Sequence, residues 1–456
     1  MQHERFHYNS IDELADTIDN MKLNIPLSNN ISVLAKPLKI NRKKVPNSMA
    51  VHPMEGCDGT SEGKPGELTY RRYKRFAAGG AGILWFEATA VIHEGRANPR
   101  QLLISESNAK NLHNLLKSAL FEFGVRYGSK HKPYTVLQLT HSGRYSRPER
   151  QQRPLIASGN PYLDKKYSNN IIRHIVTDKK LEELEENYVS AAIIAQQIGF
   201  DAVDIKSCHG YLISELLSSA ARTGQYGGNF ENRTRFLVNI FDKIRTRTSN
   251  TIDLALRLNA YDAVPYPYGW GVNRRDYRNF DLKEPKKLVK LLHKKGLKLL
   301  NISAGNPYYN PHIGRPYDTG PYIPEEHPLC GVERLLNLCR EIQQSVPTVP
   351  VVATGFSWLR EFGAQCAAGA VENGWCKLAG FGRQAFAYPD FADDILKKGG
   401  MDRNKCCIAC GKCSEIMRFD GRTGCVIRDS SAYLPIYKEV SKGKPSFIGK
   451  YIANHV

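Results

Sequence analysis

The chain has 456 residues, of which 41% are hydrophobic and 24% are charged. This composition is typical of a packed globular protein and excludes a disordered or collagen-like chain. The length suits one large domain with an appendage, or two to three average domains. The net charge is +19, from 64 Lys and Arg against 45 Asp and Glu. Because the basic residues are spread along the chain, we expect no nucleic-acid partner, and a non-catalytic basic binding protein is the alternative.

No stretch approaches the roughly 20 consecutive apolar residues that a membrane-spanning helix needs, so we expect no membrane partner. The first seven residues are polar and lack the apolar core of a secretory signal. We therefore expect a cytoplasmic protein. In that reducing compartment the 11 cysteines are expected to be thiols or metal ligands rather than disulfides.

Short runs rich in Val, Ile and Leu alternate with longer segments of helical spacing along most of the chain. The expected strands are Val45–Pro53, Gly82–Val91, Tyr134–Thr140, Ala202–Ile205, Ile252–Leu258, Leu297–Ile302, Val349–Ala353 and Trp375–Leu378. The expected helices are Leu68–Ala78, Asn108–Gly124, Leu181–Ile198, Asn232–Thr246, Glu284–His293, Gly331–Gln344, Trp358–Ala368 and Phe391–Lys397. Buried strands that alternate with amphipathic helices are typical of parallel βαβ units, and eight such units close a (β/α)8 barrel.

The sequence therefore predicts an α/β fold, a (β/α)8 TIM barrel over residues 35–400. Residues 1–34 form an N-terminal extension, and residues 401–456 form a short Cys-rich C-terminal segment. The alternative is a doubly wound open sheet, which would normally carry a G-x-G-x-x-G fingerprint after its first strand. The segment His52-Pro-Met-Glu-Gly-Cys does not fit that fingerprint, and the glycines at 79, 80 and 82 suit a turn after a helix. The barrel is therefore favoured.

The densest group of candidate catalytic residues follows the fourth strand, in Asp204-Ile-Lys-Ser-Cys-His-Gly-Tyr-Leu. In a barrel, catalytic side chains lie at the C-terminal ends of the strands. Lys206 and His209 would both donate hydrogen bonds to one carbonyl or carboxylate oxygen. Tyr211 is a candidate proton donor, because a nearby cation loosens the proton of a phenol. The structural alternative is a helix start that the histidine caps and against which the tyrosine packs.

Arginine and glycine at other strand ends indicate an anionic ligand. Arg257 lies inside the apolar strand Ile252–Leu258, where a guanidinium must meet an anion or several acceptors. It would suit the N1 and O2 side of a flavin, and an ion pair inside the barrel is the alternative. Gly355, Gly382 and Arg383 follow strands seven and eight, where barrels commonly hold a phosphate, although a simple turn explains them equally well.

Four cysteines after the barrel have the most specific spacing in the chain. Cys407, Cys410, Cys413 and Cys425 form C-x2-C-x2-C-x11-C. This pattern is typical of a [4Fe–4S] cluster or a tetrahedral zinc site, and metal-free thiols are the third reading. We favour iron and sulfur. If Cys406 replaced Cys407 as the first ligand, the first spacing would become C-x3-C, which fits such a site less well.

Longer motifs resemble those of the old yellow enzyme family. They are His209-Gly-Tyr-Leu-Ile-Ser-Glu-Leu-Leu-Ser, Tyr226-Gly-Gly-Asn-Phe-Glu-Asn-Arg-Thr-Arg-Phe, Leu137-Gln-Leu-Thr-His-Ser-Gly-Arg and Gly382-Arg383, in order within residues 35–400. The Cys-rich segment resembles the branch of 2,4-dienoyl-CoA reductase and trimethylamine dehydrogenase, which carry a [4Fe–4S] cluster just after the barrel. Those large relatives continue into FAD- and nucleotide-binding domains, and residues 401–456 are too few for them. We therefore expect any cluster to serve a separate electron-transfer partner or another subunit.

The resemblance implies an FMN site and assigns residues to it. Pro53, Met54 and Glu55 would line the flavin ring with Ala88 beside it, Gln138 would bond the pyrimidine edge, Arg257 would face N1 and O2, and Gly355, Gly382 and Arg383 would hold the phosphate. Lys206 and His209 match the substrate-anchoring pair, and Tyr211 matches the proton donor. Two residues depart from the family. Lys206 stands where histidine is common, which suggests an anionic substrate group or a changed reaction, and Glu55 stands where a small Cys or Thr often tunes the flavin.

The resemblance thus implies an FMN-dependent ene-reductase. NADH or NADPH, or electrons arriving through the cluster, would reduce the flavin, and hydride would pass to an alkene conjugated to a carbonyl or carboxyl group of a small unsaturated substrate. The enzymatic alternative is an oxidative, amine-dehydrogenase-like flavoenzyme that passes electrons out through the cluster. A homo-oligomer is compatible with the sequence, which leaves the oligomeric state open.

Overall fold

The computed structural model describes residues 2–165 and 174–447. Within them, parallel strands close into a barrel in the order β3-β4-β5-β8-β9-β10-β11-β12, with β12 pairing back to β3. The barrel strands are β3 (Met49–Val51), β4 (Ile83–Ala90), β5 (Tyr134–Thr140), β8 (Ala202–Ile205), β9 (Asp253–Tyr261), β10 (Leu297–Ala304), β11 (Val351–Ala353) and β12 (Leu378–Phe381). The predicted (β/α)8 fold is confirmed.

Each predicted strand overlaps an observed one, and the largest shift is in the last. The prediction was Trp375–Leu378, whereas β12 is Leu378–Phe381. Trp375 closes the turn after a helix, because its backbone N–H donates to Ala370 O at 2.8 Å. Gly380 lies in β12, where a Cβ would be 2.2 Å from the His52 ring nitrogen Nε2. A side chain at this position would therefore collide inside the barrel.

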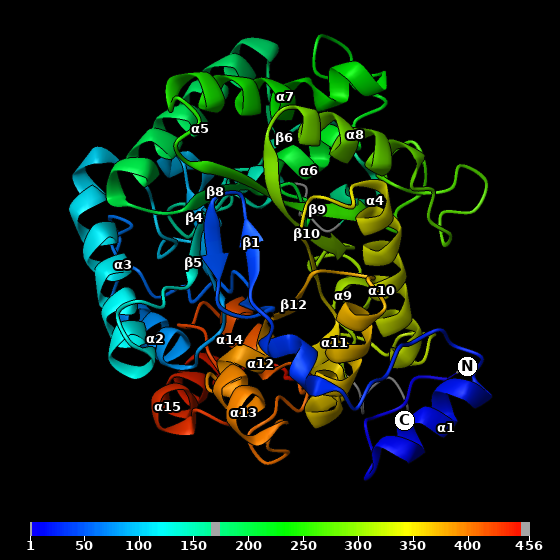
Figure 1. The fold of residues 1–456 in the computed structure, drawn as a ribbon. Helices are drawn as coiled ribbons and strands as arrows, with labels where there is room; N and C mark the ends of the chain where they lie inside the picture. Colours follow the sequence, from blue (N-terminus) through cyan, green and yellow to red (C-terminus); the bar gives the residue numbers. More distant parts are fainter. Residues whose placement is uncertain (1, 166–173, 448–456) are drawn as a thin grey trace.

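Helices surround the strands and form the outer ring in Figure 1. They are α2 (Glu67–Ala78), α3 (Glu106–Tyr127), α5 (Asp178–Ile198), α6 (Leu212–Leu217), α7 (Phe230–Arg247), α8 (Lys283–Lys294), α10 (Pro328–Ser345), α11 (Gly363–Glu372), α12 (Arg383–Ala387) and α13 (Phe391–Lys398). Side chains of Ser105, Thr177 and Asn229 accept hydrogen bonds from the first turns of α3, α5 and α7, so the sequence sets these helix starts. No helix in the described ranges is long and apolar enough to cross a membrane.

The helix predicted at Trp358–Ala368 is two elements. A 3-10 segment, η4 (Phe356–Phe362), precedes α11 (Gly363–Glu372). Inside η4 the helical path is broken at Arg360, whose backbone has φ of 50° and ψ of −124°. Its guanidinium donates to Asp318 at 3.0 Å. A tertiary contact therefore overrides the helical spacing of the sequence.

A short hairpin closes the N-terminal end of the barrel. It consists of β1 (Leu38–Ile40) and β2 (Lys43–Val45) and lies across the middle of the ring in Figure 1. Ile40 and Val45 are fully buried against inward-facing barrel residues such as Trp85 and Leu299. Each aliphatic side chain buried in this way stabilises the fold by roughly 1.5–3 kcal/mol. The barrel is therefore packed at this end, and a ligand has room only at the other.

The segments before and after the barrel pack onto it. In the N-terminal segment, which includes α1 (Ile11–Asn20), Phe6 makes an edge contact with Trp358 at 5.3 Å between ring centroids. The C-terminal segment contains α14 (Lys412–Arg418) and α15 (Ser430–Ser441). Asp429, which precedes α15, accepts hydrogen bonds from Arg71 and Arg75 of α2. The remaining elements are η1 (Ile31–Ala35), η2 (His93–Gly95), η3 (Gly143–Tyr145), β6 (Leu155–Ile156), α4 (Pro161–Asp164), β7 (His174–Ile175) and α9 (Pro311–Gly314).

Candidate active site

A cavity lies at the C-terminal ends of the barrel strands. Most of the residues expected to form the site line it, although they come from separate strands and loops. They are Pro53, Met54, Glu55, Lys206, His209, Tyr211, Arg257, Gly355, Gly382 and Arg383. The barrel topology brings these residues together, because all strands are parallel and their carboxyl ends meet at one face.

Two residues expected at the flavin do not line the cavity. Ala88 is fully buried within β4. Gln138 lies in β5, and its amide nitrogen donates to the carboxylate of Asp204 at 2.6 Å. The flavin contacts of Ala88 and Gln138 stay predictions.

Lys206 forms an ion pair with Glu55 inside the cavity. The Lys206 Nζ lies 3.1 Å from Glu55 Oε1, and its side chain is 4% exposed. The same Nζ lies 3.8 Å from the centroid of the Tyr211 ring, at cation–π distance. The sequence suggested a lysine charge directed at an anionic substrate group. In the structure that charge is compensated by a carboxylate from the loop after β3.

Tyr211 holds its proton more firmly than expected. Burial is the largest cause, followed by the Glu55 carboxylate and Tyr308, and together they raise the Tyr211 pKa well above its usual value. The Tyr211 hydroxyl lies 3.4 Å from Glu55 Oε1 and 3.2 Å from the Tyr308 hydroxyl. The direction of this shift is opposite to the one expected from the neighbouring cation, because burial and the Glu55 carboxylate dominate the Tyr211 pKa. A protonated phenol is still suited to donate to a strongly basic carbon.

His209 is a neutral imidazole. Burial, with Arg257 and Lys206 nearby, holds the His209 pKa well below its usual value. Its ring Nε2 lies 3.1 Å from the Ser303 hydroxyl at the end of β10. The next residue must be glycine, because Gly210 has φ of 71° and a Cβ there would lie 2.3 Å from the Asn306 amide nitrogen. The His-Gly turn thus aims a neutral hydrogen-bonding ring at the cavity.

The Arg257 guanidinium is buried without an acceptor. It is 9% exposed, and its Nε has no hydrogen-bond partner. No hydrogen bond or ion pair joins the guanidinium to another residue of the described chain. Asp204, the acid beside it, accepts instead from Gln138, Trp85 and the Arg257 backbone N–H. The alternative of an ion pair within the barrel is therefore not observed, and the arginine fits a ligand that supplies acceptors, as a flavin pyrimidine does.

A second arginine, not expected from the sequence, joins Arg383 at the end of the cavity formed by the loops after β11 and β12. Arg383 donates to Pro316 O at 2.7 Å, and Arg315 donates to the Ser414 hydroxyl. Burial and the guanidinium groups of Arg383 and Arg418 lower the Arg315 pKa to about 10. Gly355, with φ of 116°, lies at the same cavity. This end therefore carries two guanidinium groups and a permissive backbone, which suits a phosphate. The signal that was missed is Gly314-Arg315, the same dipeptide as Gly382-Arg383.

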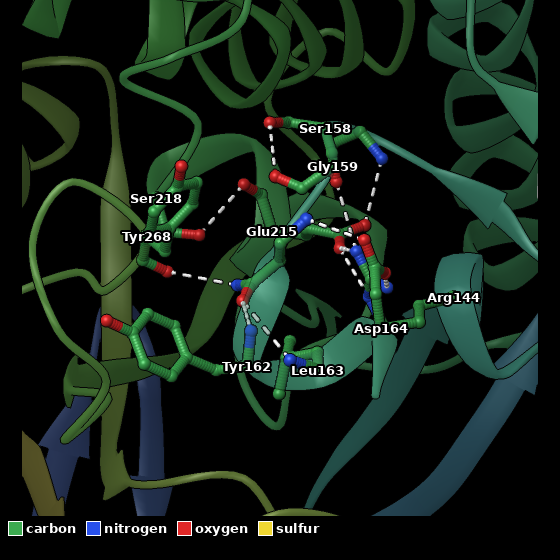
Figure 2. Close-up of polar contacts among 12 residues, drawn as sticks. Arg144, Ser158, Gly159, Tyr162, Leu163, Asp164, Glu215, Ser218 and Tyr268 are labelled. Atoms are coloured by element: carbon green, nitrogen blue, oxygen red, sulfur yellow. Dashed lines mark hydrogen bonds and ion pairs between the residues drawn. The ribbon is translucent and has the colours of Figure 1, made fainter. Parts of the chain in front are cut away.

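Tyr308 and Tyr145 also contribute to the site without a sequence signal. The two rings stack with centroids 3.9 Å apart, and Tyr308 contacts Tyr211. The neighbouring Arg144 is fully buried between the carboxylates of Glu215 and Asp164 (Figure 2). Arg144 therefore anchors the excursion after β5 to α6, beside Tyr211. Residues 166–173 of this excursion lie outside the described ranges.

The four expected cysteine ligands line one smaller cavity. Cys407, Cys410, Cys413 and Cys425 all border it, and burial raises the Cys410 pKa to about 11. Cys406 is instead bonded to Gln384, its sulfur lying 3.1 Å from the amide nitrogen. In the described part of the chain, no three His, Cys, Asp or Glu side chains converge as ligands of one metal ion do. The four thiols thus border one cavity without converging on a single point. Cys413, Arg383 and Phe386 border both cavities.

Residues 33–401 match the sequence profile of the NADH:flavin oxidoreductase / NADH oxidase family. The chain belongs to this family, that of the old yellow enzymes. An NADPH dehydrogenase of Bacillus cytotoxicus is 31% identical over 277 residues, covering 60% of this chain and 71% of that protein. The predictions of an oxidoreductase, of FMN and of NADH or NADPH are confirmed by family membership, which also speaks against the non-catalytic alternative.

Solved structures share the fold at lower identity. A 2-naphthoyl-CoA reductase bound to 2-naphthoyl-CoA has a TM-score of 0.70 at 21% identity, covering 90% of this chain and 58% of that chain. The 6-hydroxypseudooxynicotine amine oxidase of Pseudomonas geniculata N1 has a TM-score of 0.67 at 19% identity, covering 89% of this chain and 55% of that chain. This chain therefore spans little more than half the length of these two proteins.

Buried neutral histidines give the fold a defined pH dependence. Burial lowers the His141 pKa to about 4, and its Nδ1 accepts from Gly143 N at 3.0 Å. Because the unfolded state binds a proton near pH 6.5, the contribution of neutral His141 to stability is complete above that pH and is lost as pH falls. We predict that the destabilisation caused by His141→Gln shrinks by about 2 kcal/mol between pH 7 and pH 5. Urea unfolding of both proteins at each pH measures it. A pH-independent difference would contradict the neutral assignment, since other titrating groups cancel between the two proteins.

Proposed function

We propose that the protein is an ene-reductase that reduces an alkene conjugated to a carbonyl or carboxyl group of a small substrate. The observation that carries this proposal is that Lys206, His209 and Tyr211 line one cavity with an unpartnered Arg257. FMN, when bound there, supplies the hydride that it has taken from NADH or NADPH. Arg257 would donate to acceptor atoms of its pyrimidine edge, near Gln138 and Ala88, while Pro53, Met54 and Glu55 would border the ring. Gly355, Gly382 and Arg383 would hold its phosphate.

Lys206 and His209 would bind the carbonyl oxygen of the substrate. The ammonium has three donors, of which one is used by Glu55, and the neutral imidazole adds another. These donors stabilise negative charge that develops on the oxygen as hydride adds to the β-carbon. Tyr211 would then transfer its proton to the α-carbon. The raised pKa of Tyr211 keeps the phenol protonated until the α-carbon is basic enough to accept the proton.

A [4Fe–4S] cluster in the cysteine cavity belongs to the proposal, with Cys407, Cys410, Cys413 and Cys425 as ligands. Support comes from the shared border of the two cavities at Cys413, Arg383 and Phe386. This border also favours the second candidate function, an amine-oxidising enzyme whose electrons leave through the cluster. Anaerobic bleaching of the flavin by an amine without nicotinamide would support that second function.

The division into residues 1–34, 35–400 and 401–456 is also a proposal, as are a cytoplasmic location, a separate electron-transfer partner and a homo-oligomeric state. The location is supported by the 11 cysteines, which a reducing compartment keeps as thiols or metal ligands. An electron-transfer partner follows from the cluster, which would need an acceptor or donor outside the barrel. Size measurement of the purified protein decides the oligomeric state.

Removal of the Tyr211 hydroxyl should separate the two half-reactions. In Tyr211→Phe we expect oxidation of the reduced flavin by an enone to slow by about 100-fold or more, because the α-carbon loses its proton donor. Reduction by NADH or NADPH should be unchanged within about twofold, since it needs no such proton. Anaerobic stopped-flow absorption measures both steps. Tyr261→Phe is the matched control, because its hydroxyl donates to Tyr277 O and does not line the cavity. An equally fast enone step in Tyr211→Phe would contradict the role.

Loss of one cysteine ligand should remove the cluster. Cys410→Ser changes a residue that borders the cysteine cavity but not the larger one, so we expect iron and sulfide to fall while FMN is retained. Cys406→Ser is the matched control and should keep its iron. Iron and sulfide analysis of anaerobically purified or reconstituted protein measures the change. A wild-type protein free of iron after reconstitution would rule the cluster out.

A further inference from the structure

The substrate side of the cavity contains one cation and one carboxylate. The charged residues that line the whole cavity are Glu55, Lys206, Arg257, Arg315 and Arg383. Arg315 and Arg383 lie at the phosphate end, and Arg257 faces the expected pyrimidine. Lys206 is therefore the cation left for a substrate, and Glu55 is the one carboxylate among the described residues of the lining.

Two groups contact the Lys206 charge. Glu55 Oε1 lies 3.1 Å from the ammonium, and the centroid of the Tyr211 ring lies 3.8 Å from it. The Glu55 side chain is 16% exposed, so it retains a face toward the cavity, whereas Lys206 is 4% exposed. An incoming group thus meets a paired ammonium with a carboxylate beside it.

We propose that Glu55 makes this side of the cavity electrically neutral and thereby selects neutral carbonyl substrates over carboxylates. The inference rests on the proposed function of the site and names its substrate class. A carbonyl oxygen needs only a hydrogen-bond donor, which the paired lysine still provides. A substrate carboxylate would have to lie beside Glu55 or displace it, and in an enclosed site that repulsion is weakly screened. Glu55 is then a specificity-determining residue, at a position where the sequence led us to expect flavin tuning.

Two probes of the same shape test the inference without turnover. Benzamide is neutral and benzoate is anionic, and binding of each to the oxidised holoenzyme is followed by the change in flavin absorption. We expect wild-type protein to bind benzamide at least as tightly as benzoate. In Glu55→Gln, benzoate affinity should rise by about tenfold or more, because the lysine charge is released, while benzamide affinity should change by less than about threefold.

A double-variant cycle separates charge from shape. In Glu55→Gln combined with Lys206→Met the gain in benzoate affinity should vanish, because it depends on the ammonium. Lys206→Met alone should weaken benzoate relative to benzamide, which keeps the test decisive if Glu55→Gln fails to fold. An unchanged benzoate-to-benzamide ratio in Glu55→Gln, or a gain that persists in the double variant, would overturn the proposal.

Turnover distinguishes this inference from the proposed function. Wild-type protein is assayed with NADH or NADPH and a neutral enone such as cyclohexenone. If the probe ratios change as expected and no enone is reduced, charge selection stands and the ene-reductase assignment fails. If the enone is reduced and the ratios do not change, the assignment stands and the role of Glu55 fails.

Discussion

A buried guanidinium without an acceptor is the constraint on which this account depends. Arg257 lies in a barrel strand whose neighbours are apolar, and its nearest acid is already bonded to other donors. Burial without acceptors costs several kcal/mol, and the packed hairpin at the opposite end leaves the ligand face as the direction from which acceptors arrive. The arginine, the open end of the barrel and the arginines at the phosphate end therefore all favour the same kind of ligand, an elongated one with a polar ring and an anionic tail.

The catalytic groups are coupled through one carboxylate. Glu55 contacts both Lys206 and Tyr211, so the charge on the lysine and the proton on the phenol are set together. Arg144 stabilises the same region from the other side, because it fixes the excursion that carries Tyr145. The site is thus assembled from distant segments, each held by an ion pair or a stacked ring rather than by local sequence.

The sequence predicts the barrel well because burial of parallel strands leaves a strong pattern of apolar runs. It also predicts which residues reach the ligand face, since strand ends follow from strand positions. It does not predict the Lys206–Glu55 pair, whose members are 151 positions apart, because no local spacing reports a tertiary contact. Tyr308 was missed for the same reason, since it lies in a loop whose path depends on packing, whereas Arg315 had an overlooked signal in the Gly314-Arg315 dipeptide. The positive φ of Arg360 and the strand glycine Gly380 show tertiary contacts overriding local preference.

FMN titration of the apoprotein tests the central claim most directly. We predict one FMN bound per chain by wild-type protein, with affinity at least about tenfold weaker in Arg257→Gln, because the pyrimidine loses a charged donor. Arg247→Gln, which changes an exposed cation in the last turn of α7, should bind FMN as wild-type does. Equal affinity in wild-type and Arg257→Gln, measured by quenching of flavin fluorescence, would contradict the account.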